Sequence, residues 1–537
     1  MTEQRETPRR AWSAAEIAAE LRLPPPTAQQ EAVIQAPVGA PALVVAGAGS
    51  GKTETMAGRV LWLLANGHVR PAEVLGLTFT RKAAGELAVR MNERIAQLVR
   101  AGVIDDHDDL EQPQIATYNS YANRLYRDNA SAIGREGDGA VLGEAAAWQL
   151  ARTTVTRSAD LRLLEQDRSL DQLTEAVLAI SRAIADNIAD PAAIRGLAAD
   201  FAGILDLPLG SRYTYDWVAE LVDTVGQLDL LVDLALEYGA AKRRRGFVEY
   251  SDQVTLALEI LRAKPSLIDE QRAEHRIVLL DEYQDTSVTQ AWLLSELFAG
   301  HAVMAVGDPN QSIYGWRGAS AGNLAAFPRQ FGGDARYSLS MSWRNGRRIL
   351  DVANRLVEPF RAGAAVEVEK LVPRTDAGAE PVGVSFRQSV TDEAETVARW
   401  LDEQLSAPGG PHSAALLMRA RKNHPVFLAA LRERGVRYHV LGVGGLLAEP
   451  EVADVVSALS VVHSVDAGME LLRLLAGSRW RIGAADLHEL AQLSSVLKSR
   501  GIDQRTLPDE VRDRLRNSLA DGERGSIVDA LDFLATA

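Results

Sequence analysis

The chain has 537 residues, of which 47% are hydrophobic and 24% charged, a composition typical of a folded protein. This length is too great for a single core, so several domains are expected. The absence of cysteine excludes disulfides, thiolate zinc sites and iron–sulfur clusters in this chain. Because the formal net charge is −14, a bound nucleic acid would have to enter a local basic channel.

Targeting and membrane signals are absent from the sequence. The N-terminal segment has no apolar region of the kind found in signal peptides. No run of about 18 apolar residues is available to span a bilayer. With the lack of cysteine, these features predict a cytoplasmic protein without a membrane partner.

Short, continuous apolar runs predict buried strands near the start and the middle of the chain. These runs are Leu43–Ala46, Val74–Phe79, Ile277–Leu280 and Ala302–Val306. The first is followed by a helical pattern over Thr53–Leu64. Strands with both faces buried are typical of a parallel sheet covered by helices, so the expected fold class is α/β.

The patterns divide the chain into five regions. A polar lead-in over 1–24 precedes a first α/β domain, formed by 25–124 and 241–335. Residues 125–240 are rich in Ala and Leu at helical spacing and predict an all-helical insertion. A second α/β pattern covers 336–445, with a strand expected at Ala414–Met418, and 446–537 is mainly helical. Lys242–Arg245 fits a DNA-binding patch, although a solvated helix face is the preferred interpretation.

A glycine-rich loop joins the first predicted strand to the following helix. Its residues are Ala46, Gly47, Ala48, Gly49, Ser50, Gly51, Lys52 and Thr53. Glycines let backbone N–H groups point at phosphate oxygens, the lysine binds the β- and γ-phosphates, and the hydroxyl binds magnesium. Although Ala46 replaces the usual first glycine, the order of strand, loop and helix favours a nucleoside triphosphate site over a chance turn.

Two acidic residues, Asp281 and Glu282, follow the predicted strand Ile277–Leu280. The carboxyl ends of parallel strands meet at one edge of a sheet, which would place this pair beside the phosphate loop. One carboxylate can then hold magnesium while the other orients a water molecule. A solvated acidic turn is the alternative.

A third motif, VGDPNQSIYGWRG, follows the strand Ala302–Val306. It joins Gln311, suited to sensing a phosphate, to an aromatic and basic cluster of Tyr314, Trp316 and Arg317. Aromatic residues beside a cation are typical of a base-stacking platform, although Trp316 could instead belong to a core. The three motifs together predict triphosphate hydrolysis coupled to single-stranded DNA.

In this order, the motifs resemble those of superfamily 1 DNA helicases of the UvrD/Rep/PcrA type. Within that group the chain is most similar to motor subunits of helicase–nuclease machines of the RecB, AddA and AdnB kind. The resemblance runs from about Pro26 to the end and implies RecA-like P-loop NTPase domains. The first would comprise 25–124 and 241–335, and 336–445 would be the first part of the second.

The resemblance implies how the nucleotide is held. Gln29, or alternatively Gln30, would recognise adenine, and Trp343 would stack on the base. Lys52 and the rest of the glycine-rich loop would bind the phosphates of ATP. Arg344 would act as an arginine finger.

Further roles are implied for magnesium, catalysis and DNA. Asp281 and Thr53 would bind Mg²⁺, Glu282 would activate water, and Gln311 would link the γ-phosphate to DNA. The implied DNA-binding residues are Phe79, Thr80, Tyr314, Trp316 and Arg317. We expect an ATP-dependent helicase or translocase acting on single-stranded and tailed duplex DNA, 3′ to 5′, in repair or recombination.

The sequence also departs from the family pattern. Asn119 stands where relatives usually carry histidine, and Glu249 replaces an aspartate. The later motifs H-x-[AS]-K-G-x-E and Y-V-A-x-T-R-A are absent, so the chain is expected to be truncated within the second helical insertion, 446–537. The alternative function is a non-motor, nucleotide- and DNA-binding subunit of a helicase–nuclease complex, with a second subunit as partner.

Overall fold

The computed structural model describes residues 10–104, 111–165, 168–206, 216–315, 318–320, 322–361, 363–409, 411, 413–441, 450–463, 467–488 and 490–491. They fall into two compact units, one up to Val382 and one from Gly383 on. No helix within these ranges is both long enough and apolar enough to cross a bilayer.

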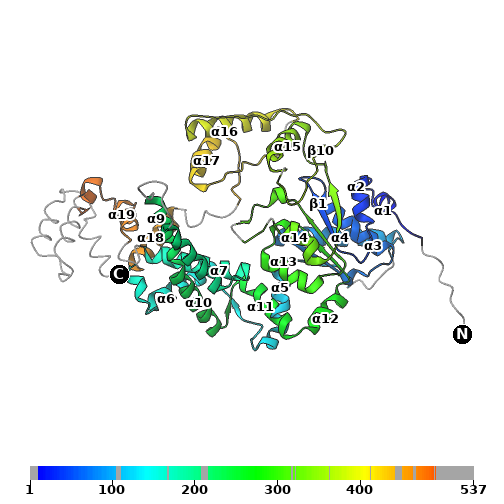
Figure 1. Cartoon of the computed structure of the whole chain (residues 1–537). Helices are drawn as coiled ribbons and strands as arrows, with labels where there is room; N and C mark the ends of the chain where they lie inside the picture. The colour runs from blue at the N-terminus through cyan, green and yellow to red at the C-terminus, as the bar shows by residue number, and fades with distance from the viewer. Residues whose placement is uncertain are drawn as a thin grey trace, which may run out of the picture. The chain divides into compact units, whose positions relative to one another are not determined.

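The first unit is built on a six-stranded parallel sheet (Figure 1). In spatial order its strands are β3 (Gln114–Thr117), β2 (Val74–Thr78), β6 (Ile277–Leu280), β7 (Val303–Gly307), β1 (Ala42–Ala46) and β8 (Ala335–Leu339). The pairing of all neighbours is parallel, so their carboxyl ends share one edge. The predicted α/β fold class is confirmed, with a parallel sheet flanked by helices.

Both faces of this sheet are covered, which explains why its central strands are continuously apolar. Leu43 and Val45 of β1 point into one core, while Val44 and Ala46 point into the other. The helices on the first face are α5 (Tyr118–Asn129), α11 (Tyr250–Ala263), α13 (Val288–Phe298) and α14 (Gly322–Phe331). The helix α12 (Ser266–Glu274) adds Leu267 to the same core. Those on the second are α1 (Ala14–Glu20), α2 (Ala28–Ile34), α3 (Lys52–Ala65) and α4 (Arg81–Arg100).

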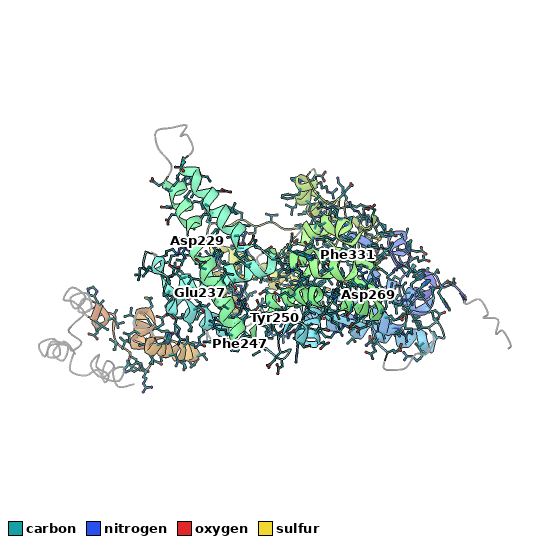
Figure 2. All side chains as sticks on the ribbon, turned by 60° about the horizontal axis from the view of Figure 1, so that its bottom comes forward. Asp229, Glu237, Phe247, Tyr250, Asp269 and Phe331 are labelled. Atoms are coloured by element: carbon teal, nitrogen blue, oxygen red, sulfur yellow. The ribbon has the colours of Figure 1, made fainter. Side chains whose placement is uncertain are left out.

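A helical insertion separates α5 from the return of the chain to the sheet. It consists of α6 (Glu144–Arg157), α7 (Leu170–Asn187), α8 (Pro191–Ala202), α9 (Asp216–Gly226) and α10 (Leu228–Arg244). These helices have a core of their own, centred on Leu150, Val177 and Tyr238. At its base, β4 (Ala140–Val141) pairs with β5 (Phe247–Val248). Figure 2 shows Asp229 and Glu237 on α10, with Phe247 and Tyr250 where the chain re-enters the first domain.

The expectation of a solvated face at Lys242–Arg245 is wrong for its first member. Arg243, Arg244 and Arg245 are exposed, but Lys242 is 5% exposed. Its ammonium bonds to Glu249 at 2.7 Å and to both oxygens of Asp252. Sequence spacing does not reveal this burial, because both partners lie beyond the end of α10.

The chain beyond the sheet is short of strands. Strand β8 begins at the predicted boundary, residue 335, and extends four residues past it. Strand β9 (Met341–Ser342) pairs with β10 (Val372–Pro373). The helices that follow are α15 (Arg347–Arg361) and, in the second unit, α16 (Val390–Ser406), α17 (His424–Glu433), α18 (Pro450–His463) and α19 (Gly468–Ala476). The strand expected at Ala414–Met418 is not formed, because no strand in the described part of this unit pairs with it. The domain boundaries remain predictions.

Candidate nucleotide and DNA site

The glycine-rich loop lies at the carboxyl edge of the sheet, between β1 and α3. Gly49 and Gly51 have φ values of +73° and +82°, a region that side chains with a Cβ rarely adopt. The loop is closely surrounded, since a Cβ on Gly49 would lie 2.8 Å from Ser342 Oγ. Ser50 Oγ is buried without a hydrogen-bond partner. An orphaned hydroxyl in a loop at a helix N-terminus fits a site for phosphate oxygens.

Lys52 and the acidic pair meet directly beside this loop. Lys52 Nζ lies 2.7 Å from Glu282 Oε2, and the lysine side chain is only 10% exposed. Glu282 adopts a left-handed conformation, with φ of +50°. Strained backbone of this kind is frequent at functional sites. The fold therefore brings Lys52 and Glu282, which are 230 residues apart in the sequence, into contact.

Asp281 is buried at the end of β6. Burial and the neighbouring Glu282 raise the pKa of Asp281 to about 6, although Lys52 acts in the opposite direction. Thr53, in the first turn of α3, supplies a hydroxyl. Carboxylate and hydroxyl oxygens are suitable ligands for Mg²⁺, and a dication would offset the charge repulsion at Asp281. The described residues contain no group of three or more acidic or imidazole side chains arranged for a metal, so phosphate and water would complete the coordination.

A chain of hydrogen bonds that we did not predict links Glu282 to Gln311. Gln284 Nε2 donates to Glu282 Oε2 at 2.7 Å, and Gln284 Oε1 accepts from the backbone N–H of Asp308 at 3.0 Å. Gln311 Nε2 then donates to Asp308 Oδ2 at 2.6 Å. A Cβ on Gly307 would lie 2.7 Å from Gln284 Oε1, so the glycine makes room for this bridge. Gln284 lies two residues after Glu282 and Asp308 lies in the VGDPNQSIYGWRG motif, but only the fold shows that they meet.

Residues from beyond the sheet also reach the loop. The backbone N–H of Trp343 donates to Gly49 O at 2.8 Å. A Cβ on Gly49 would contact the Cβ of Arg344 at 2.8 Å. The backbone of Trp343 and Arg344 therefore lies next to the phosphate loop, and both side chains are exposed. Their predicted roles require this proximity.

The two glutamine candidates for base recognition occupy different surroundings. Gln29 Oε1 accepts from Ser340 N at 2.9 Å, and its Nε2 donates to Glu369 at 2.9 Å. Gln30 is buried, and its Nε2 lies 3.5 Å from Ser50 O in the phosphate loop. Gln29 thus connects α2 to the segment that carries Trp343, whereas Gln30 connects α2 to the phosphate loop.

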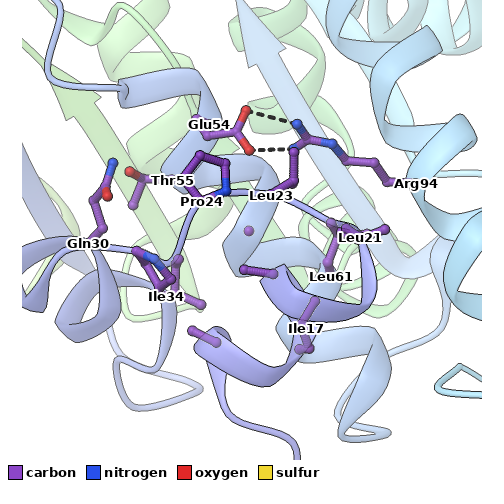
Figure 3. A pocket seen from close by; sticks show the side chains of 14 residues that line it. Ile17, Leu21, Leu23, Pro24, Gln30, Ile34, Glu54, Thr55, Leu61 and Arg94 are labelled. Carbon is purple, nitrogen blue, oxygen red and sulfur yellow. Dashed lines mark hydrogen bonds and ion pairs between the residues drawn. The ribbon is translucent and has the colours of Figure 1, made fainter. Parts of the chain in front are cut away.

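A small cavity of about 70 Å³ lies behind Gln30 (Figure 3). The cavity lies between α1, α2 and α3, and the side chains that line it are mainly aliphatic. At its rim Glu54 forms an ion pair with Arg94, with a nearest distance of 2.7 Å.

The candidate DNA contacts are partly described. Phe79, after β2, stacks on Tyr314 with ring centroids 4.7 Å apart and planes at 30°. Thr80 caps the N-terminus of α4, because its hydroxyl accepts from Ala83 N at 3.1 Å. Trp316 and Arg317 lie outside the described residues. Two motifs that are separated by more than 200 residues therefore form one aromatic pair on the same edge of the sheet.

Comparison with known proteins gives an independent view of this chain. The family model "UvrD/REP helicase N-terminal domain" matches residues 26–332. The ATP-dependent DNA helicase UvrD1 of Mycobacterium leprae is 28% identical over 478 residues, which cover 85% of this chain and 54% of the relative. The ATP-dependent DNA helicase PcrA of Bacillus subtilis is 24% identical, with 87% and 57% covered. DNA helicase II of Haemophilus influenzae is 26% identical, with 79% and 52% covered. The chain spans about half the length of these curated relatives.

Proposed function

Because the chain belongs to the UvrD/REP helicase family, we propose that it is an ATP-hydrolysing motor acting on single-stranded DNA and tailed duplexes. The observation that carries the proposal is the meeting of Lys52 with Glu282 beside a loop that also contacts Trp343 and Arg344. Such a constellation provides phosphate binding, water activation and a second cation at one place. The relatives above are named as ATP-dependent DNA helicases.

The residues suggest an order of events. The ammonium of Lys52 would leave Glu282 for the phosphates of ATP, which frees the Glu282 carboxylate to orient a water molecule. Thr53 and Asp281 would hold Mg²⁺, which neutralises phosphate charge when bound. Arg344 would approach the γ-phosphate as the nucleotide site closes. Gln29 and Trp343 would hold the base.

DNA would be coupled to this site through the hydrogen-bonded chain from Glu282 to Gln311. Gln311 precedes Tyr314 by three residues, so a change at the γ-phosphate would move the aromatic pair of Tyr314 and Phe79. Bases stacked on that pair would then be displaced along the protein. Movement from 3′ to 5′, and a role in DNA repair or recombination in the cytoplasm, are proposed from the resemblance alone.

An ATPase assay with and without poly(dT) tests the proposal. We expect hydrolysis that rises with poly(dT) and disappears in Lys52→Ala. An unstimulated rate, or a rate that Lys52→Ala leaves unchanged, would reject the motor assignment.

The alternative is a non-motor subunit of a helicase–nuclease complex that binds nucleotide and DNA. It is favoured by one observation: beyond β8, the described residues form only the two-stranded pair of β9 and β10. Binding of ATP and oligo(dT) without any hydrolysis would support this alternative.

A further inference from the structure

Arg59 is a buried arginine on α3, seven residues after Lys52. It is 4% exposed, and its guanidinium donates to three backbone carbonyls. The acceptors are Ile34 O at 2.9 Å, Ala36 O, and Pro37 O at 3.1 Å. Burial lowers the pKa of Arg59 to about 10, so the side chain is still charged at neutral pH. Within the described residues it forms no ion pair, so its charge is satisfied by carbonyl dipoles and by the ring of Trp62 at 5.4 Å.

The three carbonyls lie at the C-terminal end of α2 and in the turn that follows it. The last carbonyls of a helix lack intrahelical partners and carry negative partial charge, which a guanidinium satisfies. The adjacent Gly58 allows the two helices to come close, since a Cβ there would lie 2.9 Å from Ile34 Cδ1. Gly58 and Arg59 together form a clamp that holds the end of α2 against α3.

This clamp lies at the opposite end of α2 from the glutamines. The helix has seven residues and is therefore only about 10 Å long. A helix this short moves as a rigid body, so holding Ile34 also restricts Gln29 and Gln30. Figure 3 shows Ile34 and Gln30 on α2, with Thr55 of α3 beside Gln30.

We propose that Arg59 is a positioning residue for recognition of the nucleotide base. By holding α2 against α3, it sets the distance between the base-recognising glutamine and the phosphate loop that precedes α3. This inference rests on the proposed function. Arg59 itself would touch neither base nor phosphate, because its guanidinium faces the backbone of the 34–37 segment.

The test separates base binding from phosphate binding. Dissociation constants for Mg–ATP and for magnesium tripolyphosphate are measured by competition with a fluorescent ATP analogue. Arg59→Lys keeps the charge but lacks the planar guanidinium that bonds to several carbonyls at once. It should weaken Mg–ATP binding about three- to tenfold, the range expected for one lost hydrogen bond. Arg59→Met should weaken ATP further, and both variants should bind tripolyphosphate as the wild type does. The KM for ATP should rise in Arg59→Lys while kcat is retained.

Asn66→Ala is the matched control for loss of stability. Asn66 lies at the far end of α3 and ties Trp12 to that helix through hydrogen bonds of 2.8 and 3.1 Å. This variant should melt earlier without changing the ratio of the two dissociation constants.

The outcomes separate the inference from the function on which it rests. Equal weakening of both ligands in Arg59→Lys, or no weakening, would overturn the positioning role while leaving the motor assignment intact. A wild type that binds ATP no better than tripolyphosphate would show that no base is recognised. A wild type that binds neither ligand would overturn the proposed function itself.

Discussion

At the scale of single residues, the nucleotide site concentrates carboxylates where there is little water. Asp281 is 4% exposed, and burial with Glu282 as neighbour raises its pKa to about 6. Burial and Glu282 likewise raise the pKa of Asp285 to about 6. Ionised carboxylates so close together destabilise the fold until a cation approaches. In the proposed site, a bound magnesium ion would relieve this repulsion, so the arrangement would exchange stability for function.

Asp281→Asn should therefore stabilise the protein, increasingly so as the pH rises. In the folded state Asp281 holds its proton up to a pH of about 6, whereas the ordinary pKa of an aspartate side chain is 3.8. Because the folded state binds the proton more tightly, the free energy of unfolding falls as pH rises from about 4 to about 6, and stays lower above that. The variant loses this penalty, which is about 3 kcal/mol at a pH above both pKa values.

Thermal unfolding without magnesium checks this expectation. The melting temperature of Asp281→Asn should exceed that of the wild type by more at pH 7.5 than at pH 5. A difference that shrinks with rising pH would mean that Asp281 is stabilised as an anion.

Glu282→Gln should separate ATP binding from hydrolysis. The amide can still accept a hydrogen bond from Lys52 or Gln284, so the site should keep its shape. Hydrolysis should fall by a factor of about 10² or more, because an amide cannot take a proton from water. Mg–ATP affinity should change by no more than a few-fold. If the variant lost Mg–ATP affinity but hydrolysed the ATP that it still bound at the normal rate, the roles of Asp281 and Glu282 would be the reverse of those proposed.

At the scale of elements, the aromatic pair of Phe79 and Tyr314 joins the end of β2 to the loop after β7. Tyr314→Ala should weaken oligo(dT) binding by about 1–3 kcal/mol, the contribution of one stacked base. Raising the salt concentration should weaken binding by both proteins but should preserve the difference between them, because stacking releases no counterions. Fluorescence anisotropy at two salt concentrations measures both effects.

Tyr250→Ala is the control for the aromatic pair. Tyr250 is an exposed tyrosine at the start of α11 and is not a member of the stacked pair. Normal DNA affinity in Tyr314→Ala, or an equal loss in Tyr250→Ala, would remove the pair from the proposed DNA path.

The helical insertion is held to the first domain by buried charges. Glu249 accepts from Lys242 at 2.7 Å and from Tyr238 at 2.9 Å, and it also pairs with Arg182 of α7. Burial alone would raise the pKa of Glu249, but Lys242, Tyr238 and Arg182 together outweigh burial and keep the pKa below its usual value. Three elements thus depend on one carboxylate.

Lys242→Met should destabilise the protein by about 3 kcal/mol, since it leaves a buried carboxylate without its main counter-charge. Arg244→Met is the matched control on the same helix and should have little effect, because Arg244 is exposed. Adding Glu249→Gln to Lys242→Met should restore much of the loss. Chemical denaturation followed by circular dichroism measures these differences, and equal effects of Lys242→Met and Arg244→Met would contradict the proposed network.

Elements and contacts differ in how far the sequence predicts them. The strand Ile277–Leu280 was predicted to the residue, because burial on both faces leaves a continuous apolar run. Ala414–Met418 has a similar run but forms no strand, since a strand also needs a neighbour to accept its hydrogen bonds. The partners of Arg59 and Lys242 could not be predicted, because charge alone does not show which backbone or carboxylate will meet it after folding.

At the scale of the whole molecule, apolar side chains remain exposed outside the first domain. On α15 they are Ile349, Val352, Leu356 and Phe360, spaced to share one helix face. In the second unit Val384, Phe386 and Leu417 are almost fully exposed on segments without regular structure. Exposed apolar surface of this extent is typical of regions that pack against further protein. A second motor core is not assembled by the described residues alone.

This 537-residue chain should therefore bind Mg–ATP and oligo(dT) weakly, hydrolyse ATP slowly and fail to unwind a 3′-tailed duplex. Translocation needs two domains that close on ATP, and beyond the first sheet the described residues bring Trp343 and Arg344 to the phosphate loop but no second arginine finger. One missing cation at a transferring phosphoryl group can cost about 10³–10⁵ in rate. A fluorescence strand-separation assay measures unwinding, and light scattering against concentration measures association through the exposed apolar segments. Rapid strand separation by a monomer would show that this chain by itself forms a working motor.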